Sequence, residues 1–322
     1  MKALVLSKFG STKHLSIKDV PKPTPRENEV LIKIHATAVN DYDWTMVSGK
    51  PYAFRLLHGI FKPRNPIPGM ELSGIVEAIG EKVTTHKPGD AVYGDISNFG
   101  FGSFAEYISI DEKAVVPLPE GINFEIATTI PHASLLAVQG LIDYGKIKKG
   151  EKILINGAGG GVGCFGLQIA KTYDAEVTGV DTGDKLETMK NIGFDHIIDY
   201  KKTDFTQSGE QYDLIIDAKT TRRPSAYLQA LFPGGRYISV GGTVRGLFQM
   251  LIAQKRLSRK SGKSLQILAL KSNEGLEYIH DLFEAGKIDP VIDGPYPLEQ
   301  APMAIQRFGD AVHHGKVVVK IS

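Results

Sequence analysis

The feature that most constrains the fold is a glycine-rich segment in the middle of the chain, which reads INGAGGGVGCFG over residues 155–166. It follows KILIN, a continuous apolar run typical of a buried parallel strand. After the glycines, residues with apolar or small side chains recur at helical spacing: Val162, Phe165, Gly166, Ile169, Ala170 and Tyr173. The sequence therefore predicts a tight strand-to-helix turn, where free N–H groups and the helix dipole attract phosphate.

The spacing of the glycines favours a dinucleotide site over a purely structural turn. The pattern GxGxxG falls on residues 158–163, with alanine in place of the first glycine. Gly160 would let a pyrophosphate approach the backbone, and Gly163 would let the helix pack closely on the strand. An acid also closes the next predicted strand, EVTGVD. We predict cofactor contacts from Ala158, Gly160, Gly161, Val162, Gly163 and Asp181.

The only cysteine of the chain, Cys164, lies in the first turn of the predicted helix. A helix N-terminus lowers a thiol's pKa, but the chain has no second cysteine to resolve a redox intermediate. We therefore interpret Cys164 as a compact packing residue. A single cysteine also excludes an intrachain disulfide framework and a multi-cysteine zinc site.

Charge and hydropathy exclude several other classes of protein. The formal charge of +2 gives no general argument for a nucleic-acid or membrane partner. The start, MKALVLSKFGSTKH, lacks the apolar stretch of a secretory signal, so we expect a cytoplasmic protein. The basic run KRLSRKSGK, residues 255–263, is interpreted as a solvated loop. Contact with an anionic ligand and non-specific nucleic-acid affinity are the alternatives for this run.

Two kinds of pattern divide the chain. Residues 1–122 contain short β-type runs between Gly/Pro-rich turns, typical of a small barrel or sandwich. Residues 123–271 alternate strands with helical patterns, as in a parallel sheet wound on both faces. The tail, residues 272–322, ends in a strand, GKVVVKIS, and is more like the first third. We predict an α/β protein with one domain from 1–122 and 272–322 and a dinucleotide-binding domain from 123–271.

Motifs along essentially the whole chain resemble those of one superfamily. PGMELSGIVEAIG, KPGDAVYG, GSFAEYISI, the glycine-rich turn and GKVVV stand in the order found in medium-chain dehydrogenases/reductases. The sequence is most similar to the zinc-free quinone oxidoreductase branch. The resemblance implies a GroES-like β-barrel domain, a doubly wound Rossmann domain and an active cleft between them. It also implies a homodimer, because the last Rossmann strand, near LQILAL, is an apolar edge that needs covering.

Departures from the zinc-dependent relatives indicate that no metal is used. Those relatives carry a histidine where this chain has Met70, and their cysteine ligand has no counterpart in ATAVNDYDW. Their four-cysteine structural zinc lobe is missing too. A thioether does not replace imidazole as a zinc ligand in such a site. His132, His313 and His314 could be offered as substitutes, but lone histidines are more often hydrogen-bonded surface or cleft residues.

Hydride transfer to an electron-poor quinone or enone needs no metal, because the acceptor delocalises the incoming charge. In the resembling branch an asparagine and nearby tyrosines face the cleft, and Asn40 and Tyr52 match them. Asn40 would orient the cofactor or an acceptor oxygen, or would only cap a helix beginning at DYDW. Tyr52 would donate a hydrogen bond to the developing enolate, or would be a loop aromatic. His132 lies where the superfamily begins a helix whose end faces the nicotinamide, although Leu136 replaces the usual threonine. We predict that His132 contacts the cofactor, and a purely structural role is the alternative.

The choice of nicotinamide cofactor rests on opposing signals. Asp181 would bind the ribose hydroxyl of NAD(H) and repel a 2′-phosphate, unless an exposed carboxylate rotates outward. Lys185 and Tyr200 have the spacing that holds the 2′-phosphate in NADPH-using relatives. Gly241 and Gly242, which end the predicted strand RYISVGG, complete the predicted cofactor contacts. We predict a preference for NADP(H), with NAD(H) also usable.

These residues predict an NAD(P)H-dependent, zinc-independent reductase of quinones or α,β-unsaturated carbonyls. One alternative is an enoyl-thioester reductase of the same superfamily, which needs a basic groove for the phosphates of its substrate. Another is a nucleotide-binding redox sensor with little turnover.

Overall fold

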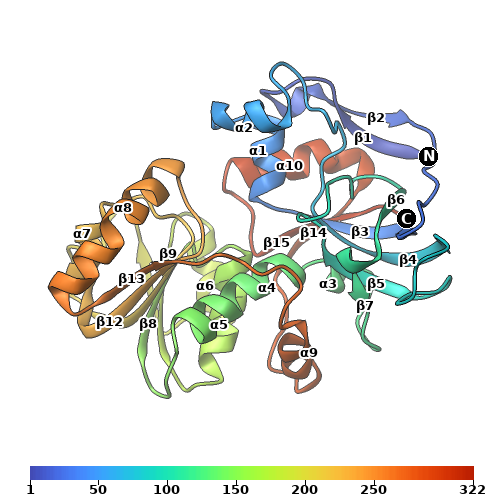
Figure 1. Cartoon of the computed structure of the whole chain (residues 1–322). Coiled ribbons are helices and arrows are strands. Elements are labelled where there is room, and N and C mark those ends of the chain that lie inside the picture. The colour runs from blue at the N-terminus through green and yellow to red at the C-terminus, as the bar shows by residue number, and fades with distance from the viewer. The chain divides into compact units, whose positions relative to one another are not determined.

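The structure is a computed structural model that describes residues 1–56 and 58–322 of the chain. Figure 1 labels its helices and strands. The helices are α1 (Asp41–Ser48), α2 (Tyr52–His58), α3 (Phe124–Ala127), α4 (Pro131–Val138), α5 (Gly161–Lys171), α6 (Lys185–Ile192), α7 (Pro224–Tyr227), α8 (Val244–Ser261), α9 (Leu276–Glu284) and α10 (Ala301–Gly309). Short helical turns of other types are η1 (Thr12–His14), η2 (Glu112–Ala114), η3 (Gln139–Tyr144), η4 (Leu228–Ala230) and η5 (Leu298–Gln300).

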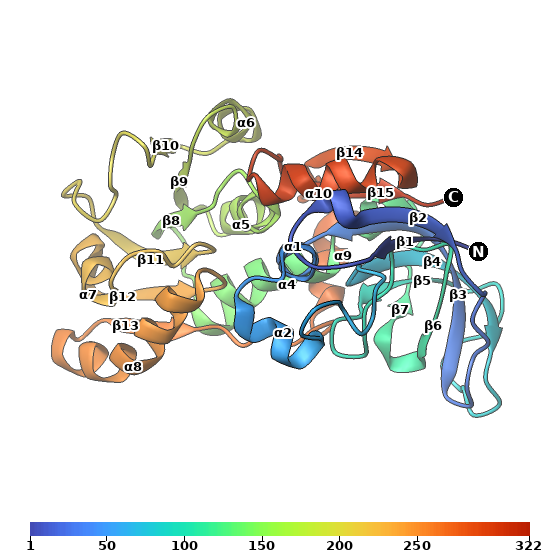
Figure 2. The ribbon, with the colours of Figure 1, turned by 90° about the horizontal axis from the view of Figure 1, so that it is seen from above.

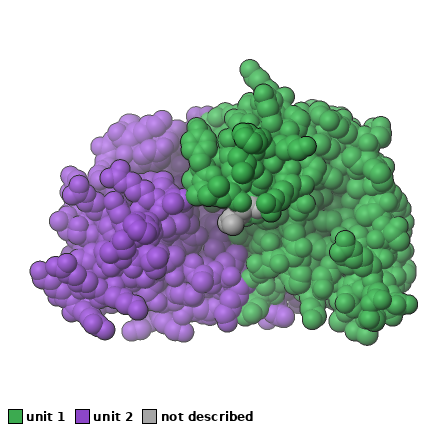
Figure 3. All heavy atoms as spheres, turned by 45° about the horizontal axis from the view of Figure 1, so that its top comes forward, with its two compact units in different colours: residues 1–132, 272–274, 292–322 green, residues 133–271, 275–291 purple. Residues whose placement is uncertain are grey.

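The strands belong to two separate sheets and one two-stranded ribbon. They are β1 (Lys2–Leu6), β2 (Leu15–Asp19), β3 (Glu29–Val39), β4 (Glu71–Ile79), β5 (Ala91–Asp95), β6 (Tyr107–Asp111), β7 (Val116–Pro117), β8 (Lys152–Asn156), β9 (Glu176–Asp181), β10 (His196–Asp199), β11 (Tyr212–Asp217), β12 (Leu231–Ser239), β13 (Ser264–Ile267), β14 (Ile292–Pro297) and β15 (Lys316–Lys320). Contacts divide the chain into two compact units, which Figure 3 colours separately.

Unit 1 comprises residues 1–132, 272–274 and 292–322. Its main sheet has the order β14-β15-β3-β4-β5-β7, and β6 also pairs with β3. The long strand β3 contributes to two hydrophobic cores. Ile32 and Ile34 pack with Leu72 in one core, whereas Val39 packs with residues of α10, including Ile305, in the other. The C-terminal strand β15 pairs antiparallel with β3, so the tail of the chain completes this unit.

Unit 2 comprises residues 133–271 and 275–291. Its sheet is parallel throughout, with the order β10-β9-β8-β11-β12-β13. In Figures 1 and 2, α5 and α6 cover one face of this sheet and α7 and α8 cover the other. This is the strand order of a doubly wound dinucleotide-binding sheet, in which ligands bind at the carboxyl ends of the strands. Asn156, Val180 and Asp217 are register partners at that edge.

The boundaries of the units differ from the predicted domains in two places. Residues 123–132 belong to unit 1. Phe124 of α3 stacks on His35, with ring centroids 4.3 Å apart, and its carbonyl accepts a 2.7 Å hydrogen bond from Ser73. Residues 275–291 belong to unit 2, where Gln168 of α5 exchanges two hydrogen bonds with the backbone of Asp289. The sequence pattern shows where short strands give way to alternating strands and helices. Packing contacts, however, set the boundaries between the two units at other residues.

The basic run predicted as a solvated loop is largely helical. Residues 255–261 form the last turns of α8. Lysine, arginine and leucine are good helix formers, and the buried Met250 and partly buried Leu257 face the sheet one heptad apart. Among the described residues, no helix combines the length and apolar composition that crossing a membrane requires.

Candidate active site

The glycine-rich turn connects β8 to α5 as predicted. Gly157 has a φ of 90°, in the left-handed region that favours glycine. A Cβ on Gly163 would lie 2.3 Å from the carbonyl oxygen of Ala158, so only glycine allows α5 to pack this closely on the turn. Cys164 is 2% exposed, and its thiol lies 3.8 Å from the same carbonyl. The surroundings of Cys164 are those of a small packing residue.

The first turn of α5 has the properties of a phosphate-binding site. Gly160 is its N-cap and supplies no side chain to cap the helix. Among the described residues, no partner accepts from the N–H groups of Gly161, Val162 and Gly163. Unpaired amides at the positive end of a helix dipole suit the pyrophosphate of a dinucleotide. The turn therefore fits the cofactor that the sequence predicts.

Asp181 is only 6% exposed, so the alternative in which an exposed carboxylate rotates outward does not apply. Its carboxylate faces the turn, where it accepts hydrogen bonds from the N–H groups of Gly159 and Thr182, each at 3.0 Å. The Lys185 ammonium lies 4.0 Å from this carboxylate and is also buried. Tyr200 is 47% exposed and is tied to Asp181 by a 3.1 Å backbone hydrogen bond. The structure thus brings the three predicted cofactor-selecting residues together.

Gly241 and Gly242 follow β12 at the same edge of the sheet. The Gly241 carbonyl accepts a 2.6 Å hydrogen bond from the hydroxyl of Thr220. Gly242 has a φ of 139°, and a Cβ there would lie 2.5 Å from the Lys219 carbonyl oxygen. The close approach of the Lys219 backbone therefore explains why residue 242 is glycine, whether or not a cofactor binds here.

In unit 1, Asn40 is part of a buried polar cluster. It is the N-cap of α1, but its side chain turns toward β4 and β15. Its amide donates to Glu71 Oε2 at 2.6 Å, and its carbonyl oxygen accepts from Lys316 Nζ at 2.6 Å. Lys316 Nζ also donates to Glu71 Oε2 at 2.5 Å. Glu71 and Lys316 are 0% and 4% exposed, so three polar groups satisfy one another away from water.

Asp43 supports this cluster from the first turn of α1. Its carboxylate accepts hydrogen bonds from the N–H groups of Asn40, at 2.9 Å, and Gly69, at 2.8 Å. Burial raises the pKa of Asp43 to about 7, although both hydrogen bonds act in the opposite direction. The Asp43 side chain thereby holds the backbone of Asn40 and the backbone of Gly69 in place.

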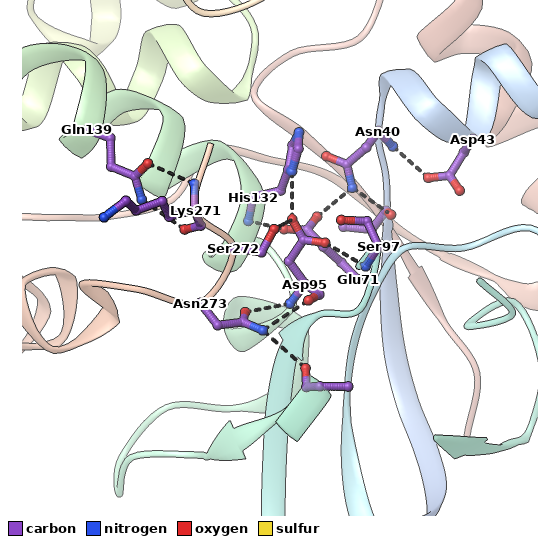
Figure 4. A network of polar contacts seen from close by, with 12 residues as sticks. Asn40, Asp43, Glu71, Asp95, Ser97, His132, Gln139, Lys271, Ser272 and Asn273 are labelled. Carbon is purple, nitrogen blue, oxygen red and sulfur yellow. Dashed lines mark hydrogen bonds and ion pairs between the residues drawn. The ribbon is translucent and has the colours of Figure 1, made fainter. Parts of the chain in front are cut away.

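His132 lies in the first turn of α4 and joins the same cluster (Figure 4). Its N–H donates to Glu71 Oε1 at 2.5 Å, and its ring Nδ1 donates to Asp95 Oδ2 at 2.8 Å. Burial on its own would lower the pKa of His132, but the hydrogen bond and charge of Asp95 outweigh it and raise that pKa. The structure thus places His132 beside Asn40's partner Glu71.

Tyr52 does not join the cluster. It begins α2, is 68% exposed and lies beneath the Arg55 guanidinium, 5.0 Å from its ring centroid. The nearby Tyr42 is held more firmly, since it stacks on Phe101 at 4.6 Å and its hydroxyl bonds His58 Nε2 at 2.8 Å.

Sequence reasoning missed Glu71, Lys316 and Asp95. Glu71 and Lys316 lie in motifs that carry the family resemblance, and Asp95 directly follows another such motif, KPGDAVYG. Their place in these motifs was a signal that could have identified them as site residues. Their pairing could not be predicted, because Lys316 and Glu71 are 245 residues apart in the chain.

The other histidines offered as zinc ligands have ordinary contacts. His313 stacks on Phe308 with ring centroids 4.5 Å apart, and the N–H of His314 donates to Asp293. Among the described residues, the grouped metal-ligating side chains are His280, Asp281 and Glu284 on α9. Two of the three are exposed, and such groups are common without a metal.

Comparison with known proteins identifies the family of this chain. The model of the alcohol dehydrogenase GroES-like domain matches residues 26–120, and the model of the zinc-binding dehydrogenases matches residues 192–319. The chain is 33% identical to quinone oxidoreductase of Sus scrofa, over 97% of this chain and 94% of that protein. It is 29% identical to the chloroplastic NADPH-dependent alkenal/one oxidoreductase of Arabidopsis thaliana, over 99% and 79%.

Solved structures agree over the full length of the chain. Quinone oxidoreductase from Coxiella burnetii matches with a TM-score of 0.86 and 26% identity, covering 100% of this chain and 99% of that one. CurK enoyl reductase matches with a TM-score of 0.81 and 25% identity, with the same coverage of both chains. The predicted GroES-like and Rossmann folds are confirmed. The chain belongs to the medium-chain dehydrogenase/reductase superfamily of pyridine-nucleotide oxidoreductases, in its zinc-free quinone oxidoreductase branch.

Proposed function

We propose that this protein is an NADPH-preferring, zinc-independent reductase of quinones or α,β-unsaturated carbonyl compounds. The observation that carries the proposal is the cation of Lys316, held by Asn40 and by Glu71, the residue that follows the buried Met70. A zinc ion added here would be repelled by the ammonium, and Met70 offers it only a weak thioether ligand. Without a Lewis acid, acceptors that delocalise incoming charge are the suitable substrates.

A bound nicotinamide cofactor supplies the hydride for such a reduction. The amides of Gly161, Val162 and Gly163 would hold its pyrophosphate. Asn40 orients the cofactor or the acceptor in this proposal, and its amide is fixed for that task by two hydrogen bonds. Tyr52 keeps its proposed role as an exposed donor toward the acceptor. Units 1 and 2 correspond to a catalytic and a cofactor-binding domain.

The proposed preference for NADPH rests on Lys185 and Tyr200. Both lie near the carboxyl end of β9, where the ribose of a dinucleotide binds. Asp181 opposes a 2′-phosphate less than an outward-facing acid would, because two backbone N–H groups and Lys185 share its negative charge. A lysine–phosphate contact contributes about 1.5–3 kcal/mol. The relative named as NADPH-dependent supports the same preference.

Asp181→Ala is expected to raise the NADPH/NADH ratio of kcat/KM by about tenfold, equivalent to ~1.4 kcal/mol. The reason is that Lys185 would lose its competing carboxylate partner. Steady-state kinetics with both cofactors measure the ratio. Asp195→Ala is the control and should leave the ratio unchanged. Asp195 directly precedes β10, whereas Tyr200 directly follows that strand. An unchanged ratio in Asp181→Ala, or a wild type favouring NADH more than tenfold, would contradict the assignment.

Two other functions compete with this proposal. A groove on unit 2, between α7 and α8, is lined by apolar residues and by the cations Arg223, Arg245, Arg256 and Lys260. Such a groove suits the phosphates of an enoyl thioester, and one structural relative is named as an enoyl reductase. A redox sensor would bind the cofactor but turn over slowly.

An acceptor panel separates these functions. Oxidation of NADPH is followed with quinones, enones and an enoyl thioester of coenzyme A, before and after treatment with a chelator. We expect quinone and enone turnover that survives chelation. Faster turnover of the thioester would favour the enoyl-thioester reductase, and tight cofactor binding without turnover would favour the sensor. Stoichiometric zinc in the purified protein, with activity lost on chelation, would refute metal independence.

We also propose a homodimer, because β13 is the edge strand of the sheet and, in the part of the chain that the structure describes, no further strand pairs with its outer side. Light scattering at micromolar concentration checks this, and a monomer would contradict it. The cytoplasmic location stays a prediction, since relatives include chloroplastic proteins.

A further inference from the structure

His132 and Asp95 form a fixed pair that the proposed function leaves without a task. Asp95 ends β5 and is 0% exposed. Besides the His132 ring, its carboxylate accepts from the Ser97 N–H at 2.9 Å and from the Ser272 hydroxyl at 3.3 Å. The backbone of His132 is held separately by Glu71. Both ends of the histidine are therefore anchored, so its ring has a defined orientation.

The other ring nitrogen of His132, Nε2, is open. Among the described residues it has no hydrogen-bond partner, and the side chain is 21% exposed. Figure 4 shows this nitrogen directed away from Asp95, with no dashed line reaching it. A carboxylate on Nδ1 fixes the tautomer and leaves Nε2 to exchange a proton with a ligand.

The charges around the pair favour the protonated ring. The charged neighbours that act on His132 are Asp95 and Glu71, which raise its pKa, and Lys316, which lowers it. Together with burial, which also lowers the pKa, the net direction is upward. Burial would raise the pKa of Asp95, but the hydrogen bond and charge of His132 lower it overall. These opposite shifts favour an Asp95 carboxylate paired with a His132 imidazolium, which can donate a proton.

We propose that His132 is the proton donor of the reductase reaction, with Asp95 as its positioning residue. This rests on the proposed function. When hydride adds to the β-carbon of an enone, the C=C π pair forms a new double bond between the α-carbon and the carbonyl carbon. The C=O π pair moves onto the oxygen and gives an enolate. The Nε2–H bond of His132 breaks, an O–H bond forms, and an enol and a neutral imidazole remain. The enol becomes the ketone in water, and the imidazole regains its proton from solvent. The two electrons come from the nicotinamide cofactor, which is oxidised.

His132→Asn tests this with little disturbance of structure. The asparagine amide can replace Nδ1 as the donor to Asp95, but nothing replaces Nε2. We expect a melting temperature and an NADPH dissociation constant close to those of wild type, with enone kcat lower by about 100-fold. A nitroalkene is the matched acceptor, because its reduced nitronate is stable without a donated proton. Its kcat should fall less than about threefold. His86→Asn, which removes another buried histidine of unit 1, should leave the ratio of the two rates unchanged.

A second readout does not depend on turnover. NMR titration of the cofactor-free protein should give His132 a pKa above its ordinary value of about 6.5, and Asp95→Asn should lower it. Wild-type enone kcat should fall as pH rises through the His132 pKa, and in Asp95→Asn that fall should occur at lower pH.

The outcomes separate the two proposals. Unchanged enone turnover in His132→Asn would overturn the proton-donor role, and a large loss in Tyr52→Phe would then assign the role to Tyr52. Equal losses with both acceptors would also overturn it, because His132 would then position the cofactor or acceptor. If His132→Asn fails to fold, an unshifted pH profile in Asp95→Asn overturns it. Wild type that reduces neither acceptor would instead refute the proposed function.

Discussion

Lys316→Met is expected to lower the free energy of unfolding by about 3–5 kcal/mol. The substitution removes the cation from a buried pair and leaves the fully buried carboxylate of Glu71 without its charged partner. The Asn40 carbonyl oxygen loses its donor as well. Urea denaturation followed by circular dichroism measures the change.

The double variant Glu71→Gln/Lys316→Met is the matched control. It replaces both charges, so the buried carboxylate no longer lacks a partner, and we expect it to recover at least half of the lost stability. The side-chain carbonyl of the introduced glutamine could still accept from the His132 N–H. A loss below about 1 kcal/mol in Lys316→Met would show that the pair is far more hydrated than the structure indicates.

Gly163→Ala is expected to weaken NADPH binding by at least about 100-fold and to destabilise the protein by about 1–3 kcal/mol. The added methyl carbon would lie 2.3–2.5 Å from the backbone of Ala158, so α5 must move away from the turn. The amides that would hold the pyrophosphate move with it. Fluorescence titration with NADPH and thermal melting measure the two effects.

Gly166→Ala provides a control on the same helix. There an added Cβ would lie 3.1 Å from the tip of the Ile155 side chain, which can shift. Alanine also has a better helix propensity than glycine, so stability and binding should change little. Wild-type affinity in Gly163→Ala would show that helix–turn packing does not position the cofactor site.

Local sequence signals predicted much of the fold. β8 and β9 occupy the residues of the predicted strands KILIN and EVTGVD, because each is a short run with β-forming Val, Ile or Thr residues. β14, with the sequence IDGPYP, was not predicted, since Gly294 and Pro295 are typical of turns. It is a strand because it pairs with β15, a contact that no local pattern encodes. α10 was missed too, although Pro302 in its first turn is a usual helix-start signal.

For the site as well, local sequence signals were predictable and contacts between distant residues were not. The cofactor turn lies in one short segment, so its residues could be named from spacing alone. The Asn40 cluster draws its members from α1, β4, β15 and α4, and only the folded chain brings Glu71, Lys316 and His132 together. The inward orientation of Asp181 could not be predicted for a related reason, since its partner Gly159 comes from a different strand-end turn.

The measurement that tests the central claim most directly follows a label from cofactor to product. The purified protein is incubated with an enone and with NADPH carrying deuterium at the transferable position of its nicotinamide. Mass spectrometry and NMR then locate the deuterium. We expect one deuterium at the β-carbon of the saturated ketone, with the same yield after chelator treatment. Oxidised NADPH without deuterium in the product, or labelled product only when zinc is added, would contradict it.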